Sequence, residues 1–217
     1  MASIAVIGGT GHLGKGIARR LAKAGHDVTI GSRAAEKAEG IAAEMGLGLK
    51  GAANEDAAKG KDVVIVTVPY ESQAATLKQI RDHVGSAIVV DTTVPLVPAK
   101  VMRVQLPAAG SAAAEAREHL GPDVRFVTAF HNVAAHILDS DAKVDCDVLV
   151  FSDDIEARKT LIGLIGDMEL RGVSGGALVN SAAAEALTSI LIYMNKTYSA
   201  DGAGIRFTGL TTAPAIP

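Results

Sequence analysis

The sequence has 217 residues, a formal net charge of −3, 48% hydrophobic residues and only 3% aromatic residues. This charge argues against a nucleic-acid-binding protein, and a core of Ala, Val, Ile and Leu suits buried parallel strands covered by helices. The single cysteine, Cys146, cannot form an internal disulfide, and no basic and apolar leader opens the sequence, so we expect a cytoplasmic protein. The longest apolar stretch, residues 175–194, contains Glu185 and is expected to be a buried or interface helix rather than a membrane span.

The first predicted elements are a strand at residues 3–7, a tight turn and a helix that begins near Gly11. Gly9, Gly11 and Gly14 fit the G-x-G-x-x-G spacing of dinucleotide-binding loops. The first glycine would allow the turn, the second would let a pyrophosphate reach the backbone, and the third would let helix and strand pack closely. The N–H groups at the start of the helix would then face the phosphates. The predicted phosphate loop is Gly9, Thr10, Gly11, His12, Leu13 and Gly14.

The end of the second predicted strand, residues 26–31, indicates which dinucleotide is bound. An Asp or Glu at this point would accept hydrogen bonds from the ribose hydroxyls of NAD. This sequence has Ser32 and Arg33 instead, with Lys37 one helical turn further on. A hydroxyl, a guanidinium and an ammonium bind a 2′-phosphate, which a carboxylate would repel. The sequence therefore predicts NADP(H).

Three apolar runs further along the chain are predicted to be central strands, at residues 63–68, 87–91 and 124–130. The carboxyl ends of parallel strands face the cofactor crevice, so the residues after these strands are candidates for contact with the dinucleotide. Val68, Pro69 and Tyr70 are expected to pack on the nucleotide, and residues 92–96, which include Val94 and Pro95, to lie near the nicotinamide. Helices are predicted between the strands. The pattern indicates an α/β fold with a Rossmann-type parallel sheet and helices on both faces.

The last part of the chain is predicted to contribute a strand at 148–151, a helix at 155–166, a short strand near 169–173 and a final helix at 176–198. The final helix is expected to be an appendage to the sheet. A tail at 202–210 follows it, and the Pro-ended segment at 211–217 is expected to be disordered.

Few residues are suited to acid–base chemistry. His131 follows the strand at 124–130 and lies in the half of the chain where a substrate is expected. There is no Ser/Lys or Tyr/Lys pair placed as in common NADP-dependent carbonyl reductases, and no cluster of Cys and His has metal-binding spacing. A dinucleotide enzyme without an evident proton donor suggests hydride transfer between two cofactors, which requires positioning more than acid–base catalysis.

The sequence resembles the NADPH-dependent reductases of coenzyme F420, the F420H2:NADP oxidoreductases. The motifs that carry the resemblance follow one another with matching spacing at residues 8–16, at 31–33 with Lys37, and at 54–58, 67–69 and 204–207. The resemblance covers essentially the whole chain. It implies an NADP-binding Rossmann domain at residues 1–150. It also implies a small C-terminal helical domain at 151–217 that completes the F420 site and pairs subunits in a homodimer.

The resemblance also implies roles for individual residues. Residues 10–13 would hold the pyrophosphate, and Ser32, Arg33 and Lys37 the 2′-phosphate. The nicotinamide half would be lined by Val68, Ser72, Val94 and Ala135. The deazaflavin ring of F420 would contact His131, Val133 and the tail residues Ala203, Ile205 and Phe207. His131 would contact the ring without acting as an obligatory acid.

Two other interpretations stay open at this point. The same Rossmann domain serves NADPH-dependent reductases of small imines or carbonyls, such as pyrroline-carboxylate reductases, which need a closed pocket with a proton donor. A non-catalytic NADP-sensing regulator is the third interpretation, and it would bind NADPH without passing the hydride to an acceptor.

Overall fold

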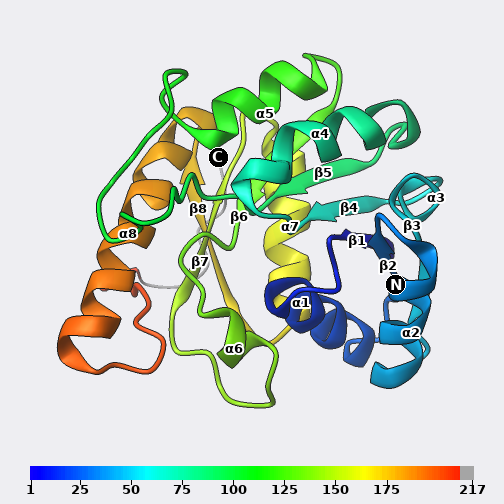
Figure 1. Ribbon diagram of the computed structural model, residues 1–217, viewed down its shortest axis with the longest axis horizontal. Helices are drawn as coiled ribbons and strands as arrows, with labels where there is room; N and C mark the ends of the chain where they lie inside the picture. The colour runs from blue at the N-terminus through cyan, green and yellow to red at the C-terminus, as the bar shows by residue number, and fades with distance from the viewer. Residues whose placement is uncertain (211–217) are drawn as a thin grey trace.

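A computed structural model describes residues 1–210. In this part of the chain, the strands form one eight-stranded sheet with the order β3-β2-β1-β4-β5-β6-β7-β8 (Figure 1). The strands are β1 (Ser3–Ile7), β2 (Asp27–Ser32), β3 (Lys50–Ala53), β4 (Val63–Val66), β5 (Ile88–Asp91), β6 (Arg125–Ala129), β7 (Asp147–Phe151) and β8 (Arg171–Gly176). The strand order reverses between β1 and β4, so the loops after these two strands diverge and leave a crevice at their carboxyl ends.

Helices cover both faces of the sheet, as predicted. They are α1 (His12–Lys23), α2 (Ala35–Met45), α3 (Asn54–Ala58), α4 (Tyr70–Ile80), α5 (Ala112–Leu120), α6 (Ala135–Leu138), α7 (Ile155–Asp167) and α8 (Ser181–Tyr198), with 3₁₀ turns η1 (Arg81–His83) and η2 (Leu178–Asn180). Side chains alternate along β1, so Ile4 and Val6 pack with α1, α2 and α7, while Ala5 and Ile7 pack with α3, α4 and α5 (Figure 1).

The sheet is mostly parallel, but β7 runs antiparallel to β6, contrary to the continuous parallel alternation that we expected. The two strands overlap in only two residue pairs, Thr128 with Phe151 and Ala129 with Val150. Strand β7 therefore begins beyond the carboxyl end of β6, and β8 pairs with β7 in parallel. The segment between β6 and β7 contains only the short α6, which packs on α1 instead of crossing the sheet. Without a crossover helix, the chain returns antiparallel.

The expected boundary between residues 150 and 151 falls inside β7, and β8 is hydrogen-bonded to β7 in the same sheet. The division into two domains stays a prediction. Helix α8 does stand apart from α1, α2 and α3, at the left edge of the molecule in Figure 1.

Two element boundaries differ from the predicted ones. The strand expected near 169–173 extends to Gly176, where a backbone φ of +85° ends it. The turn η2 follows, so the last helix begins at Ser181 rather than at residue 176.

Strand β3 was not among the strands that we predicted. Its Gly51 lies so close to α2 that a Cβ atom there would be 2.4 Å from Glu39 Cα. Glycine inside a strand marks this kind of close backbone approach. The predicted disorder of 211–217 concerns a segment outside the described residues. Within residues 1–210, none of the helices has the length and apolar character needed to cross a membrane.

Candidate cofactor-binding site

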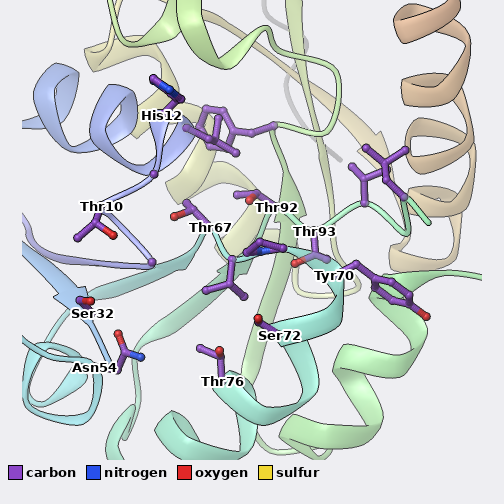
Figure 2. A pocket seen from close by; sticks show the side chains of 18 of the residues that line it. Thr10, His12, Ser32, Asn54, Thr67, Tyr70, Ser72, Thr76, Thr92 and Thr93 are labelled. Carbon is purple, nitrogen blue, oxygen red and sulfur yellow. The ribbon is translucent and has the colours of Figure 1, made fainter. Parts of the chain in front are cut away.

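A cavity of about 640 Å³ opens at the carboxyl ends of the parallel strands. The loops after β1, β2, β4, β5 and β6 contribute to its walls, together with the start of α4 and one residue of α8. Figure 2 shows polar side chains from several of these loops facing one another. The lining residues are Gly8, Thr10, Gly11, His12, Leu13, Ser32, Arg33, Ala34, Lys37, Asn54, Thr67, Val68, Pro69, Tyr70, Ser72, Thr76, Thr92, Thr93, Val94, Leu96, Phe130, His131, Val133 and Thr188. This is the position at which a dinucleotide binds an open α/β sheet.

The glycine loop has different packing at each glycine. Gly8 takes the left-handed φ of +75° that makes the turn, a role that we had assigned to Gly9. A Cβ atom on Gly9 would lie 2.7 Å from Val6 O, and one on Gly14 would lie 2.6 Å from Gly9 Cα. Both glycines therefore allow close packing of strand, loop and helix, and neither lines the cavity.

Gly11 is the open position of the loop. A Cβ atom there would have a single neighbour within 4 Å, Gly8 O at 3.8 Å. Gly11 is also the residue before α1, which begins at His12. The N–H groups of the first turn of a helix have no partner within the helix and carry partial positive charge. The loop thus leaves space in front of these donors, which fits a phosphate group.

We call the part of the cavity around Ser32, Arg33, Lys37 and Asn54 the β2 end. Ser32 is buried, while the charged side chains of Arg33 and Lys37 are exposed. Neither cation has a carboxylate within 4 Å among residues 1–210, since the ion pairs there involve other residues. Two cations without internal partners and a hydroxyl form a suitable site for a 2′-phosphate.

Asn54 adds an acceptor to the β2 end that we did not predict as a site residue. Its side chain is 2% exposed, and its Oδ1 has no hydrogen-bond partner among the described residues. Its Nδ2 donates to Gln79 Oε1 at 3.3 Å. A buried acceptor without a partner is costly, and a ribose hydroxyl would satisfy it. In the sequence it belonged only to the motif at 54–58 that contributes to the family resemblance.

We call the other part of the cavity, around Thr67, Thr92, Thr93, His131 and Val133, the β6 end. The two cofactor-contacting apolar residues predicted here, Val94 and Val133, line it. Val68, Pro69 and Ser72 also line the cavity.

His131 is 6% exposed, and burial lowers the pKa of its imidazole to about 4. Its Nε2 lies 3.4 Å from Ser181 Oγ, while its Nδ1 has no partner among residues 1–210. Ser181 Oγ donates to Glu185 Oε1 at 3.0 Å and accepts from Thr128 Oγ1 at 2.9 Å. Because Ser181 has already donated its proton, the imidazole proton is assigned to Nε2. His131 is therefore neutral near pH 7.

The structure places seven of the predicted site residues away from the cavity wall: Gly9, Gly14, Pro95, Ala135, Ala203, Ile205 and Phe207. The three tail residues lie near the start of β7. Asp147 N donates to Ile205 O at 2.7 Å, and Phe207 N donates to Asp147 Oδ2 at 2.6 Å. Ala203 N donates to Asn195 Oδ1 of α8 at 2.7 Å. Their predicted contact with the deazaflavin stays a prediction.

Sequence reasoning did not name Thr67, Thr92, Thr93 and Thr188 as site residues, although it placed Thr92 and Thr93 near the nicotinamide as part of residues 92–96. The first three follow β4 and β5 directly, so their position after apolar strands was a usable signal. Thr188 lies in the middle of α8 and reaches the cavity only through the folding of the chain, so the sequence carried no local signal for it.

Known proteins share the sequence pattern and the fold of this chain. Residues 3–95 match the family model described as NADP oxidoreductase coenzyme F420-dependent. The F420-dependent NADP reductase of Methanocaldococcus jannaschii is 41% identical over 221 residues, which covers 95% of this chain and 98% of that protein. The protein of the same name from Methanothermobacter thermautotrophicus is 39% identical over 220 residues and 95% of each chain.

Solved structures show the same fold. A crystal structure from Arthrobacter sp. FB24, described as an F420-dependent NADP reductase, matches with a TM-score of 0.82 and 23% identity over 96% of this chain and all of that one. A pyrroline-5-carboxylate reductase from Coxiella burnetii matches with a TM-score of 0.58 and 17% identity, over 80% of this chain and 58% of that one. The two archaeal enzymes are 41% and 39% identical to this chain over 95% of its length, far more similar than the pyrroline-5-carboxylate reductase. The chain therefore belongs to the family of F420-dependent NADP reductases.

Proposed function

We propose that this protein is an oxidoreductase that transfers a hydride between NADP(H) and coenzyme F420, and that the cavity described above is its site. Family membership supports both cofactors. The observation that carries the assignment to this cavity is the pairing of an open glycine loop with two cations at the β2 end, Arg33 and Lys37, that have no ion-pair partner within residues 1–210. When bound, the nicotinamide and deazaflavin rings supply the hydride donor and acceptor.

The chain's own residues would bind and orient the two cofactors. The N–H groups at the start of α1 would hold the pyrophosphate, with Thr10, Gly11, His12 and Leu13 around it. Ser32, Arg33 and Lys37 would hold the 2′-phosphate and so select NADP(H) over NAD(H). Val94 and Val133 would exclude water at the β6 end, where His131 would contact the ring without donating a proton. Ordering two rings in one cavity supplies the positioning that direct hydride transfer requires.

The reduction of a small imine or carbonyl is less well supported. Such a substrate needs a proton donor beside it, and His131 is the histidine that lines the β6 end. Its buried, neutral imidazole has a pKa of about 4, which is too low for an efficient general acid near pH 7. Tyr70 also lines the cavity, but its hydroxyl donates to Glu115 Oε2 at 2.8 Å, and burial raises its pKa to about 12.

The direct test is to mix the protein, NADPH and F420 and to follow the visible absorbance of the deazaflavin. We expect the absorbance to fall at a rate proportional to protein concentration, and NADH to be a poor substitute for NADPH. A matched control is Gly11→Val, which should fold, because the position is open, but should fail to bind the dinucleotide. Binding of NADPH without any loss of F420 absorbance would contradict the proposal and favour the NADP-sensing interpretation.

We further propose that residues 151–217 contribute to a homodimer interface and that the protein functions in the cytoplasm. Helix α8 exposes four large apolar or aromatic side chains at helical spacing: Ile190, Tyr193, Met194 and Tyr198, which are 41–74% exposed. Such a stripe is unusual on a monomer surface and suits a second copy of the chain. Sedimentation equilibrium should give a dimer for the wild type and a monomer for an Ile190→Lys, Tyr193→Lys double variant. A monomeric wild type would contradict the dimer.

A further inference from the structure

Three threonines of the β6 end donate their hydroxyl protons to other groups of the protein, unlike the hydroxyl residue of the β2 end. Thr67 Oγ1 donates to Ile7 O at 3.0 Å, Thr92 Oγ1 to Val66 O at 3.1 Å, and Thr93 Oγ1 to Asp91 Oδ1 at 2.7 Å. A hydroxyl has one proton, so each of these side chains has only lone pairs left to offer a ligand. We call Thr67, Thr92 and Thr93 the threonine cluster.

The sheet register brings the cluster together. Val66 pairs with Asp91 at the ends of β4 and β5, so Thr67 and Thr92 follow at the same level. Figure 2 shows Thr67, Thr92 and Thr93 near the centre of the cavity, with Thr10, Ser32 and Asn54 to one side.

Four other hydroxyl groups that line the cavity keep their protons available. Thr10, Ser32, Ser72 and Thr76 line the cavity, and the side-chain hydrogen bonds within residues 1–210 include none from their hydroxyls. These groups are able to donate to phosphate and ribose oxygens. The hydroxyls of Thr10 and Ser32, toward the β2 end, are therefore free to donate, whereas those of the threonine cluster can only accept.

Asp91 fixes the proton of Thr93. Its side chain is 1% exposed and receives a second hydrogen bond from Gln73 Nε2, at 2.5 Å from Oδ2. The same Gln73 Nε2 lies 3.3 Å from Ala112 O, which anchors the amide in one orientation. Burial raises the pKa of Asp91 to about 6, so the carboxyl group is ionised at pH 8 and only accepts hydrogen bonds. Thr93 must then donate to Asp91, and its remaining lone pairs are available to the cavity.

A dinucleotide whose 2′-phosphate lies at the β2 end and whose pyrophosphate lies at Gly11 extends toward the ends of β4 and β5. Its nicotinamide then reaches the threonine cluster. We infer that Thr93 accepts a hydrogen bond from the carboxamide NH₂ of the nicotinamide, and that Asp91 is the positioning residue that keeps Thr93 an acceptor. This inference rests on the dinucleotide site of the proposed function. It makes Asp91 and Thr93 determinants of specificity for a carboxamide at this point of the coenzyme.

The test compares ligands that differ only at this group. NADP⁺ has the carboxamide, its 3-acetylpyridine analogue has a carbonyl without N–H, and 2′,5′-ADP lacks the ring altogether. Calorimetric dissociation constants at pH 8 should show that the wild type binds NADP⁺ about three- to tenfold more tightly than the acetyl analogue, the range expected for one neutral hydrogen bond. Equal affinity of the wild type for NADP⁺ and the analogue would overturn the inference.

The variants then assign the effect to residues. Thr93→Val is nearly isosteric and should bring the two affinities within about twofold, while Thr93→Ser should restore the difference. Thr76→Val, the same change elsewhere in the cavity, should leave the ratio unchanged. In Asp91→Asn, Gln73 Nε2 should still donate to the side-chain oxygen at position 91. The NH₂ group introduced at position 91 then faces Thr93 and donates to Thr93 Oγ1. Thr93 then becomes free to donate, and the preference should vanish or reverse toward the acetyl analogue.

Binding of 2′,5′-ADP separates local from global effects. The Thr93 and Asp91 variants should bind it with wild-type affinity, because the β2 end is unchanged. If Asp91→Asn does not bind it, the decision rests on Thr93→Val, whose unchanged ratio would overturn the inference. No F420 is present, so failure of the F420 reaction would leave these results standing. A wild type that does not bind 2′,5′-ADP would overturn the dinucleotide site itself.

Discussion

The β2 end and the β6 end of the cavity use polar residues in different ways. At the β2 end the charged groups are exposed and lie close together in the sequence, Arg33 just after β2 and Lys37 in the first turn of α2, and neither has an ion-pair partner in the described chain. At the β6 end the polar residues are buried or half-buried, and the threonine hydroxyls are already hydrogen-bonded to the protein. These residues come from the segments that follow β4, β5 and β6 and from α8. The first arrangement suits attraction of an anion, and the second suits orientation of a neutral ring. Charge provides affinity at one end, and fixed hydrogen-bond geometry provides orientation at the other.

The largest expected effect comes from a substitution in the glycine loop. It tests whether both dinucleotide binding and the packing of the loop depend on its glycines. Gly14→Val would place a side chain where a Cβ alone lies 2.6 Å from Gly9 Cα and 2.7 Å from Thr67 Oγ1. We expect loss of dinucleotide binding and a loss of stability of several kcal/mol, as for an overpacked core. Gly11→Val should lose binding with little loss of stability. Thermal unfolding and calorimetry of the pair would check this, and equal stability of the two variants would contradict the packing role of Gly14.

A second prediction concerns stability and pH at the β6 end. Burial raises the pKa of Asp91 from 3.8 to about 6, so the folded state binds the proton more tightly and stability falls as pH rises from about 4 to 6. Burial lowers the pKa of His131 from 6.5 to about 4, so its contribution to stability rises as pH increases over nearly the same range. Each effect is worth about 3 kcal/mol in order of magnitude, and the two oppose each other.

Denaturant unfolding between pH 4 and 6.5 would separate these contributions. Relative to wild type, Asp91→Asn should gain stability as pH rises, because only the His131 contribution remains. His131→Asn should show the opposite slope. Parallel curves for wild type and both variants would show that neither group is perturbed by burial.

A third prediction concerns charge at the β2 end. Arg33→Ala should weaken NADPH binding about ten- to a hundredfold, the range for one charge-assisted hydrogen bond, and should leave NADH binding nearly unchanged. The exposed position predicts no change in stability. Fluorescence titration with both coenzymes provides the measurement. Equal weakening of NADPH and NADH binding would show that Arg33 does not bind the 2′-phosphate.

The smallest expected effect concerns His131. If it only contacts and positions the ring, His131→Ala should slow single-turnover hydride transfer by less than about a hundredfold, below most of the range for a lost general acid or base. Stopped-flow absorbance with both cofactors saturating is the measurement. A loss beyond about a thousandfold with intact cofactor binding would show that the imidazole is a catalytic acid despite its burial.

The sequence by itself determined much of the β2 end. The spacing of Gly9, Gly11 and Gly14 after an apolar strand and the basic Arg33 and Lys37 after the next strand predicted a dinucleotide loop and its phosphate pocket. These residues belong to one β-α-β unit, so their distances are set by local geometry. The same local patterns predicted the α/β class and the helices on both faces, and the resemblance of the motifs to the F420 reductases identified the family correctly.

Only the tertiary structure decided the β6 end. Thr188 and Thr93 line the same cavity although 95 positions separate them in the sequence. The hydrogen bonds of Asp91 depend on Gln73, which lies in α4. The sequence also did not predict the antiparallel pairing of β7 with β6 or the close approach of Gly51 to α2. Each depends on which elements meet in the folded chain. Hydrophobic periodicity reports which face of an element is buried. It does not report which distant element covers that face, and this pairing determines the burial of Asp91 and His131 and the direction of their pKa shifts.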